Sequence, residues 1–338
     1  MKLYTGIDLH SSNSYLGIVD RKDRVVFEGK QKNDLEGILG VLEPYRKDIE
    51  GVVVESTFNW YWLVDGLMDE GYRVHLANPS AVKQYEGLKF IDDKRDALWL
   101  ARMLRLGVLP EGYIYPKEER PIRDLLRKRL HLVKHRTSHI LSIKNLVARN
   151  QGVKISGNQV KQMEEEDAWE IFTEEHLSLA VESSIAVMRF LGRRIRKIEK
   201  VIKEKIRVRK PFKSLLTIPG VGDILGLTIM LEVGDIRRFP KVGNFSSYCR
   251  GVRSSWESNG KQKGQGNRKN GNRYLAWAFV EAANLSIRHC PYAKAYYQRK
   301  SAKTKGVVAI KALSHKLARA AYYIMRDQVP YDPLRLFG

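Results

Sequence analysis

The chain begins, after two residues, with LYTGIDLHSSNSYLGIVDRKDRVVFEGK (residues 3–30). Three short runs in this stretch are rich in β-branched and aromatic residues: LYTGIDLH, YLGIVD and RVVFEGK. Polar residues separate the runs at the spacing of β-hairpins. The pattern therefore predicts three consecutive antiparallel strands, with the acid Asp8 near the end of the first one.

Helical and strand patterns then alternate. Residues 35–45 and 59–72 have helical patterns, whereas residues 51–56 (GVVVES) and 72–79 (YRVHLANP) read as strands. The order β-β-β-α-β-α-β-α resembles the ribonuclease H or RuvC resolvase arrangement, in which helices flank a mixed sheet. We expect residues 1–110 to form an α/β, RuvC-like domain.

Residues 117–209 lack strand patterns and are expected to form a helical coiled-coil spacer. Leu126, Val133, Ile140 and Val147 recur every seven residues, and residues 181–202 carry apolar side chains at three-and-four spacing. Two long helices are predicted, as an antiparallel hairpin or as a coiled-coil dimer. Their outer faces are rich in basic residues, which either contact nucleic acid or are simply solvated: Arg123, Arg127, Lys128, Arg129, Arg193, Arg194, Arg196 and Lys197.

Residues 211–338 are expected to form a mainly α-helical domain that begins with a helix-hairpin-helix. In SLLTIPGVGDILGLTIMLEVGDI (residues 214–236) two apolar helical stretches flank the turn Pro219-Gly220-Val221-Gly222. The turn would expose backbone N–H groups at Gly220 and Gly222 to a DNA phosphate. The alternative is a tight turn between helices without a ligand.

The charge is unevenly distributed. The chain of 338 residues has a net charge of +22. Its first 110 residues hold 15 Lys and Arg against 17 Asp and Glu, a net charge of −2, so the remaining residues carry +24. This division favours a near-neutral catalytic module and a basic remainder that holds phosphate backbones.

No signal peptide or uncharged apolar run of membrane-spanning length is visible, so we expect a cytoplasmic, nucleoid-associated protein and no membrane partner. The two cysteines, Cys249 and Cys290, suit buried thiols better than a disulfide or a zinc site.

Four acids form a candidate metal site. Asp8 and Glu55 end neighbouring strands of the predicted sheet, and Asp93 and Asp96 lie three apart on one face of a helix. If that helix crosses the same sheet edge, the four carboxylates would repel one another unless cations lie between them. Two Mg²⁺ ions would relieve the repulsion and support phosphodiester chemistry. Asp92 is out of phase and suits a helix cap; the alternative is that each acid is an ordinary surface residue.

The segment RGVRSSWESNGKQKGQGNRKNGNRYL (residues 250–275) reads as a flexible glycine-rich loop. It is either a disordered basic linker or a loop that approaches a nucleic-acid backbone, and aromatic residues at both ends favour the second reading. Its serines are candidate nucleophiles, although most serines in polar loops are inert. The basic residues expected to bind nucleic acid are Lys261, Lys263, Arg268, Lys269 and Arg273.

Nearly the whole chain resembles a known family, the DEDD transposases of the insertion-sequence 110 and 1111 groups, which are bridge-RNA-guided serine recombinases. The segments that carry the resemblance are GIDLHSSNSYLGIVD, VVVEST, DDKRDALWLARML, LLTIPGVGDILGLTIMLEVGDIRRF and GNRYL. The resemblance implies that Asp8, Glu55, Asp93 and Asp96 bind Mg²⁺.

The resemblance also implies that Ser258, within WESNG, is the nucleophile. Asn259 stands where the family usually has Gly, and Ser254 where a Pro is common. Ser254 and Ser255 therefore remain alternatives.

The implied reaction is attack of the serine hydroxyl on a DNA phosphate, which gives a phosphoseryl link and a free 3′ hydroxyl. The resemblance further implies that a structured guide RNA pairs with donor and target DNA. Asp8 and Ser258 lie in different segments separated by the long helical spacer, so the active site could form between subunits. We therefore expect a homodimer through the helices and a tetramer with both DNAs bound.

Two other functions fit the residues. One is a metal-dependent nuclease or Holliday junction resolvase in which water attacks and no covalent intermediate forms. The other is a non-catalytic nucleic-acid-binding scaffold with a relict nuclease fold.

Overall fold

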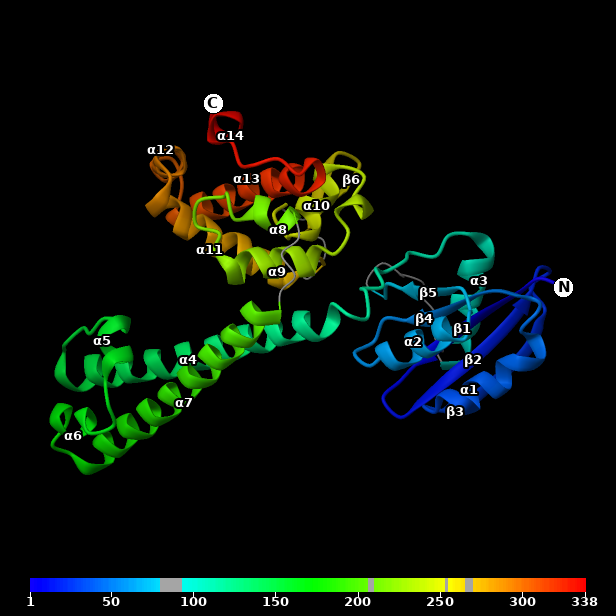
Figure 1. Cartoon of the computed structure of the whole chain (residues 1–338), viewed down its shortest axis with the longest axis horizontal. Helices are drawn as coiled ribbons and strands as arrows, with labels where there is room; N and C mark the ends of the chain where they lie inside the picture. The colour runs from blue at the N-terminus through cyan, green and yellow to red at the C-terminus, as the bar shows by residue number, and fades with distance from the viewer. Residues whose placement is uncertain (80–92, 206–209, 253–254, 265–269) are drawn as a thin grey trace. The chain divides into compact units, whose positions relative to one another are not determined.

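The computed structural model of the chain describes residues 1–79, 93–205, 210–252, 255–264 and 270–338. The chain divides into two compact units, Met1–Lys117 and Glu118–Gly338 (Figure 1). Each unit has its own hydrophobic core and is described by itself.

The first unit contains a five-stranded mixed sheet with strand order β3-β2-β1-β4-β5. Strands β1, β2 and β3 are antiparallel neighbours, and β4 and β5 add in parallel beside β1. This arrangement confirms the predicted antiparallel start and the alternation that follows it. The strands are β1 (Leu3–Leu9), β2 (Asn13–Asp20), β3 (Val25–Lys32), β4 (Ile49–Glu55) and β5 (Val74–Ala77).

Helices cover both faces of this sheet. Helices α1 (Leu35–Leu42) and α2 (Tyr61–Asp69), with the short 3-10 turn η1 (Glu43–Tyr45), pack on one face against Leu3, Ile7 and Leu9 of β1. Helix α3 (Asp93–Leu106) covers the opposite face, where Leu100 and Met103 pack against Val53. Because side chains alternate along a strand, the odd residues of β1 face α1 and α2 and its even residues face α3.

The second unit begins with two long helices that pack against each other, α4 (Arg120–Gln151) and α7 (Glu175–Lys205). Val147 shares a cluster with Val181, and Leu126 shares another with Ile202, so the two helices are antiparallel. The helices thus form a hairpin within one chain. Two short helices, α5 (Gly157–Gln162) and α6 (Asp167–Ile171), lie at its tip (Figure 1).

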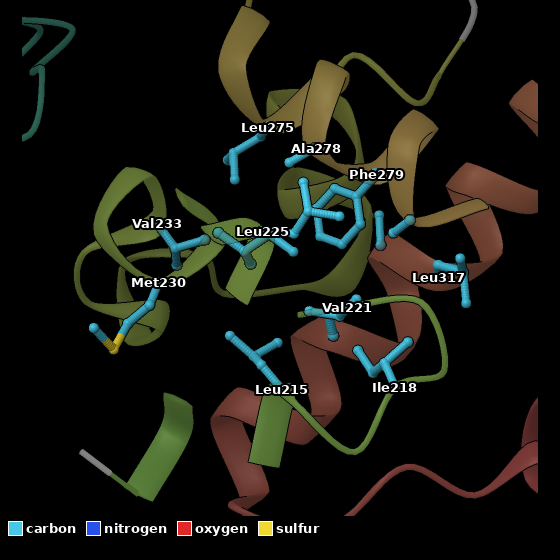
Figure 2. Close-up of a cluster of buried hydrophobic side chains, with 14 of the residues drawn as sticks. Leu215, Ile218, Val221, Leu225, Met230, Val233, Leu275, Ala278, Phe279 and Leu317 are labelled. Atoms are coloured by element: carbon cyan, nitrogen blue, oxygen red, sulfur yellow. The ribbon is translucent and has the colours of Figure 1, made fainter. Parts of the chain in front are cut away.

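The remaining elements form a helical domain around a continuous apolar core, part of which Figure 2 shows. Leu126 of α4 and Ile202 of α7 belong to this same core. Residues 117–209 and 211–338, expected as separate domains, therefore lie within one compact unit. The elements are α8 (Lys210–Leu215), α9 (Asp223–Val233), η2 (Ile236–Arg238), α10 (Val242–Tyr248), β6 (Trp256–Ser258), β7 (Lys261–Gly264), α11 (Arg273–His289), α12 (Pro291–Ser301), α13 (Gly306–Asp327) and α14 (Pro333–Phe337).

Among the described helices, none has a stretch apolar and long enough to span a membrane. Cys249 and Cys290 are both buried free thiols, as the sequence predicted.

Candidate functional site

Asp8 and Glu55 lie on the same face of the sheet and at the same edge. Strands β1 and β4 are parallel, with Gly6 opposite Val53 and Ile7 opposite Val54. Asp8 and Glu55 are the next residues of the two strands, so they lie at neighbouring positions. Val53 faces α3, and Glu55, two residues further along β4, faces the same side. Asp8 is 2 % exposed, whereas Glu55 is half-buried.

Glycines let α3 lie directly on this face. A Cβ atom at Gly6 would lie 2.0 Å from the carbonyl oxygen of Ala97, so only glycine permits the approach. A Cβ atom at Gly51, the residue of β4 opposite Tyr4, would lie 3.1 Å from Leu104 Cδ2. The first turns of α3 thus lie at Gly6 and its last turn lies level with Tyr4, so α3 runs antiparallel to β1.

The N-terminal turn of α3 consequently points toward the edge that carries Asp8. Asp96 immediately precedes Ala97, which contacts Gly6, and its side chain is half-buried. Asp93 is the first residue of α3. Asp92 and the side chain of Asp93 lie outside the described residues.

A polar cluster that the sequence reading missed fixes the loop after β1. His10 Nε2 lies 3.1 Å from Asp8 Oδ2. The carbonyl oxygen of His10 accepts hydrogen bonds from the Nδ2 groups of Asn33 and Asn59, each at 2.9 Å. The segments that follow β1, β3 and β4 are thereby joined at His10. The sequence signal was the asparagine placed shortly after a strand end, as in Glu55-Ser-Thr-Phe-Asn59.

The donor set at this edge suits a hard divalent cation, because carboxylate oxygens from Asp8, Glu55 and the start of α3 are the ligands that Mg²⁺ prefers. Among the side chains that the structure describes, no three His, Cys, Asp or Glu residues form a cluster close enough to hold a metal. The fourth predicted ligand, Asp93, is not among those side chains.

Ser258 lies at the tip of a β-hairpin, where the sequence reading expected an irregular loop. It ends β6 and is opposite Lys261 of β7. The two turn residues have positive φ, 51° at Asn259 and 68° at Gly260, as a two-residue hairpin turn requires. The exposed Ser258 hydroxyl is thus presented at a defined turn beside a lysine.

The loop that carries this hairpin, residues 249–271 and here named the serine loop, is closed at its base. Asn272 N donates to Tyr248 O at 2.6 Å, and Arg250 Nη2 donates to Gly271 O at 3.0 Å. Gly271 has a φ of 87°, and a Cβ atom there would lie 2.5 Å from Tyr248 O. The base of the loop therefore requires glycine at this position.

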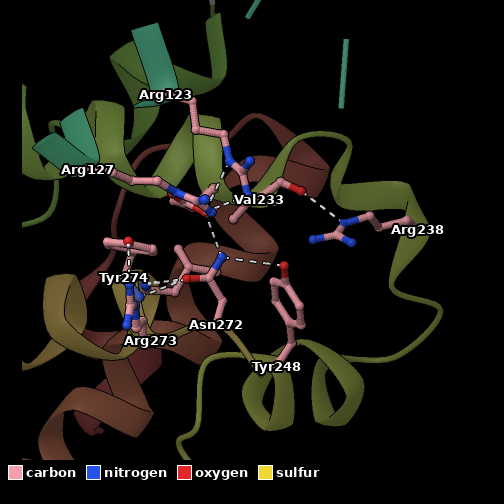
Figure 3. A network of polar contacts seen from close by, with 10 residues as sticks. Arg123, Arg127, Val233, Arg238, Tyr248, Asn272, Arg273 and Tyr274 are labelled. Atoms are coloured by element: carbon pink, nitrogen blue, oxygen red, sulfur yellow. Dashed lines mark hydrogen bonds and ion pairs between the residues drawn. The ribbon is translucent and has the colours of Figure 1, made fainter. Parts of the chain in front are cut away.

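A buried ion-pair network supports the base of the serine loop (Figure 3). Glu232, 2 % exposed, accepts hydrogen bonds from Arg127 Nη2 at 2.8 Å and from Asn272 Nδ2 at 2.7 Å. Arg123 Nη2 lies 3.0 Å from the same carboxylate. Asn272 also caps α11 by accepting from the backbone N–H groups of Tyr274 and Leu275.

This network corrects the reading of Arg123 and Arg127 as members of an outer basic face. Arg123 is 6 % exposed, and both guanidinium groups neutralise an acid 105 or more residues away in the sequence. Sequence reasoning also missed Glu232. The available signal was an acid within an apolar run, TIMLEV, the same pattern that singled out Asp8.

The electrostatics of Glu232 follow from its partners. Burial opposes its charged form and acts to raise the pKa, but the hydrogen bond from Arg127, the charges of both arginines and the Asn272 amide outweigh burial and lower it. Glu232 is therefore a carboxylate at neutral pH.

The expected nucleic-acid contacts have different surroundings. Gly220 has a φ of 91°, and a Cβ atom there would lie 2.6 Å from the backbone N of Ser286 in α11. Close packing thus accounts for this glycine without a ligand. Gly222 is exposed and caps α9. Lys261, Lys263 and Arg273 are exposed, whereas Arg268, Lys269 and the alternative nucleophile Ser254 lie outside the described residues.

Comparison with known families gives two matches. Residues 5–149 match a DEDD family of the IS110 type described as "Transposase", and residues 213–298 match the "Transposase IS116/IS110/IS902 family". The first match contains the sheet and α3, and the second contains the serine loop.

Curated relatives agree with these matches. A probable family 20 transposase of Pseudomonas aeruginosa is 23% identical over 97% of this chain and 98% of its own length. The transposase for insertion sequence element IS1111A of Coxiella burnetii is 25% identical over 68% of this chain and 63% of its own length.

Proposed function

The chain belongs to the IS110-type family of DNA transposases, and on this premise we propose that it cuts and rejoins DNA through a phosphoserine link at Ser258. The placement of Asp8, Glu55 and the start of α3 at one sheet edge carries this proposal. Strand-end carboxylates beside a helix are a suitable site for phosphoryl transfer.

In the proposed reaction the Ser258 oxygen bonds to a DNA phosphorus while the bond to the 3′ oxygen breaks. The proton that serine loses balances the proton that the 3′ oxygen gains, so the products are a phosphoseryl ester and a free 3′ hydroxyl. The reverse displacement by another 3′ hydroxyl rejoins the strands without external energy.

The acids would hold divalent cations, two Mg²⁺ ions for Asp8, Glu55, Asp93 and Asp96, which when bound stabilise the negative charge that develops on the phosphate. His10 would orient Asp8 through their 3.1 Å contact. Lys261, opposite Ser258, and the exposed Lys263 and Arg273 would hold the DNA backbone near the hydroxyl.

The proposed partners are double-stranded donor and target DNA and a structured guide RNA. The excess of +24 beyond residue 110 supports binding of both nucleic acids. We further propose a homodimer through the α4–α7 hairpin and a tetramer when both DNAs are bound.

The test is a denaturing gel of protein, guide RNA, cognate DNA and Mg²⁺. We expect a protein–DNA adduct that resists denaturant, and Ser258→Ala should abolish it. Ser255→Ala, which removes an exposed hydroxyl three residues away, should keep it. Asp8→Asn should abolish both the adduct and cleavage.

Cleavage without an adduct by the unaltered protein would favour the water-dependent nuclease instead. Loss of the adduct in Ser255→Ala but not in Ser258→Ala would assign the nucleophile to Ser255.

A further inference from the structure

The second unit contains a cavity of about 850 Å³ between α13 and the C-terminal segment. This volume lies within the range of about 300–1,000 Å³ that is typical of small-molecule sites. Nothing in the proposed reaction uses the cavity.

One wall of the cavity combines basic and aromatic side chains at helical spacing. His315, Arg319 and Tyr323 follow each other at i, i+4 and i+8 along α13, so they form one stripe along the helix. Tyr296 of α12 and Tyr331 of the C-terminal segment add two further aromatic rings.

The opposite wall is held in place by hydrogen bonds. Tyr331 N donates to Thr217 Oγ1 at 2.8 Å, and Lys316 Nζ donates to Leu336 O at 2.7 Å. Asp332 caps α14 by accepting from the backbone N–H groups of Leu334 and Arg335. The cavity is therefore preformed, which reduces the entropic cost of binding.

The charge of the lining favours an anion. Four cations, Lys316, Arg319, Arg326 and Arg335, stand against two carboxylates, Asp327 and Asp332.

The acids of the lining are already engaged. Asp327 pairs with Arg326 at 2.6 Å, and Asp332 is occupied by its helix cap. Within the described residues no carboxylate pairs with Arg319, which is exposed.

The cavity adjoins the serine loop. A Cβ atom at Gly251 would lie 3.1 Å from the Cδ2 atom of His315, so the first residues of this loop contact the basic stripe of α13. A strand held at Arg319 would thus lie beside the loop that carries Ser258.

We propose that this cavity binds an unpaired nucleotide of a nucleic-acid strand, with its base against the tyrosines and its phosphate at Arg319. Aromatic faces stack bases of any sequence, and a guanidinium binds phosphate. The bases of a duplex are already stacked on one another and paired, so single strands are preferred over duplex. The inference rests on the proposed function, because it names where a strand near the serine is held.

The test measures the fluorescence anisotropy of labelled oligonucleotides of about eight nucleotides as they bind the protein in metal-free buffer. The oligonucleotides are single-stranded DNA, single-stranded RNA and duplex DNA. Arg319→Gln and Tyr323→Leu should each weaken single-strand binding by about fivefold or more. Two control variants should change single-strand binding by less than about twofold. Lys311→Gln removes an exposed cation on the same helix outside the cavity, and Tyr292→Leu removes an exposed ring on α12. Comparison of the DNA and RNA affinities identifies the source of the strand.

Equal losses in Arg319→Gln and Lys311→Gln would show diffuse charge binding and overturn the proposal. A photocrosslink with 4-thiothymidine DNA or 4-thiouridine RNA on the unaltered protein avoids any folding defect of the variants. The crosslinked peptide should contain Tyr296, Tyr323 or Tyr331, and crosslinks found only elsewhere would overturn the proposal.

These outcomes are separate from those of the adduct gel. The binding assays need no cleavage and can be repeated in Ser258→Ala, which should bind single strands as the unaltered protein does. If the unaltered protein binds single strands and the cavity variants weaken this binding, but no adduct forms, the serine mechanism alone is rejected. If the adduct forms and the cavity variants bind single strands as tightly as the unaltered protein, the cavity proposal alone is rejected.

Discussion

Asn272 shows how one side chain can connect three parts of the fold. Its Oδ1 caps α11, its Nδ2 donates to the buried Glu232, and its backbone N closes the serine loop on Tyr248. Glu232 in turn binds Arg123 and Arg127 of α4. The loop base, α9 and the long helical hairpin are therefore held by one polar centre.

Loss of the Glu232 charge should destabilise the protein. Glu232→Gln removes the carboxylate charge that Arg123 and Arg127 bind, and breaking such a buried pair costs about 3–5 kcal/mol. The measurement is the urea midpoint at pH 7. Glu281→Gln, on the partly exposed side of α11, is the matched control and should leave the midpoint nearly unchanged.

The same residue predicts a pH dependence. The pKa of Glu232 is lowered in the fold, so the unfolded chain binds the proton more tightly. Its contribution is complete above the ordinary value of 4.5 and is lost as the pH falls through the lower folded value. Urea midpoints between pH 6 and pH 3 should therefore fall less steeply in Glu232→Gln; parallel curves would contradict this assignment.

At the scale of elements, the placement of α3 on β1 decides whether the acids meet. Gly6 leaves no room for a Cβ atom against the Ala97 carbonyl, and a Cβ atom at Gly17 on β2 would lie 2.8 Å from Leu98 Cδ2 and 3.0 Å from the Leu98 backbone N. The 2.0 Å contact at Gly6 is with backbone, so it can be relieved only if α3 moves.

Gly6→Ala should therefore move α3 away from the sheet. We expect a loss of about 1–3 kcal/mol in unfolding free energy and a large fall in adduct yield, because Asp93 and Asp96 move with the helix. Calorimetry and the adduct gel measure the two effects. Gly40→Ala in α1, where a Cβ atom has open space, should keep both, and an unchanged adduct yield in Gly6→Ala would contradict the proposed ligand set.

At the scale of the whole molecule, the α4–α7 hairpin exposes apolar side chains that a monomer does not need. Leu179 is 54% exposed and Phe190 is 52% exposed on α7, and Leu141 is 50% exposed on α4. Leu179 and Phe190 are eleven residues apart, which places them on one face of the helix. This face suits the proposed dimer.

Leu179→Glu with Phe190→Glu should convert the dimer into a monomer without lowering the melting temperature. Light scattering after size-exclusion chromatography measures the mass. Val307→Glu, which places the same charge on the 74% exposed Val307 of α13, should keep the dimer. If the unaltered protein is already monomeric at micromolar concentration, the proposed interface is wrong.

The sequence was sufficient for local features of the fold. Runs of β-branched and aromatic residues at hairpin spacing predicted the first strands. Asp8 and Glu55 were predicted to end neighbouring strands, and β1 and β4 are indeed paired. Long-range pairing was not visible, since nothing local links Arg127 to Glu232, 105 residues away. The β6–β7 hairpin was missed because its flanks are polar, although Asn259-Gly260 is the strongest short hairpin signal.

The closure of the serine loop at Tyr248 and Asn272 has a consequence for how such enzymes diverge. Because one backbone pairing joins both ends of residues 249–271, insertions or deletions between them do not displace α10 or α11. Changes in the length or charge of the serine loop can therefore alter the position of the proposed nucleophile, Ser258, while α10 and α11 stay in place.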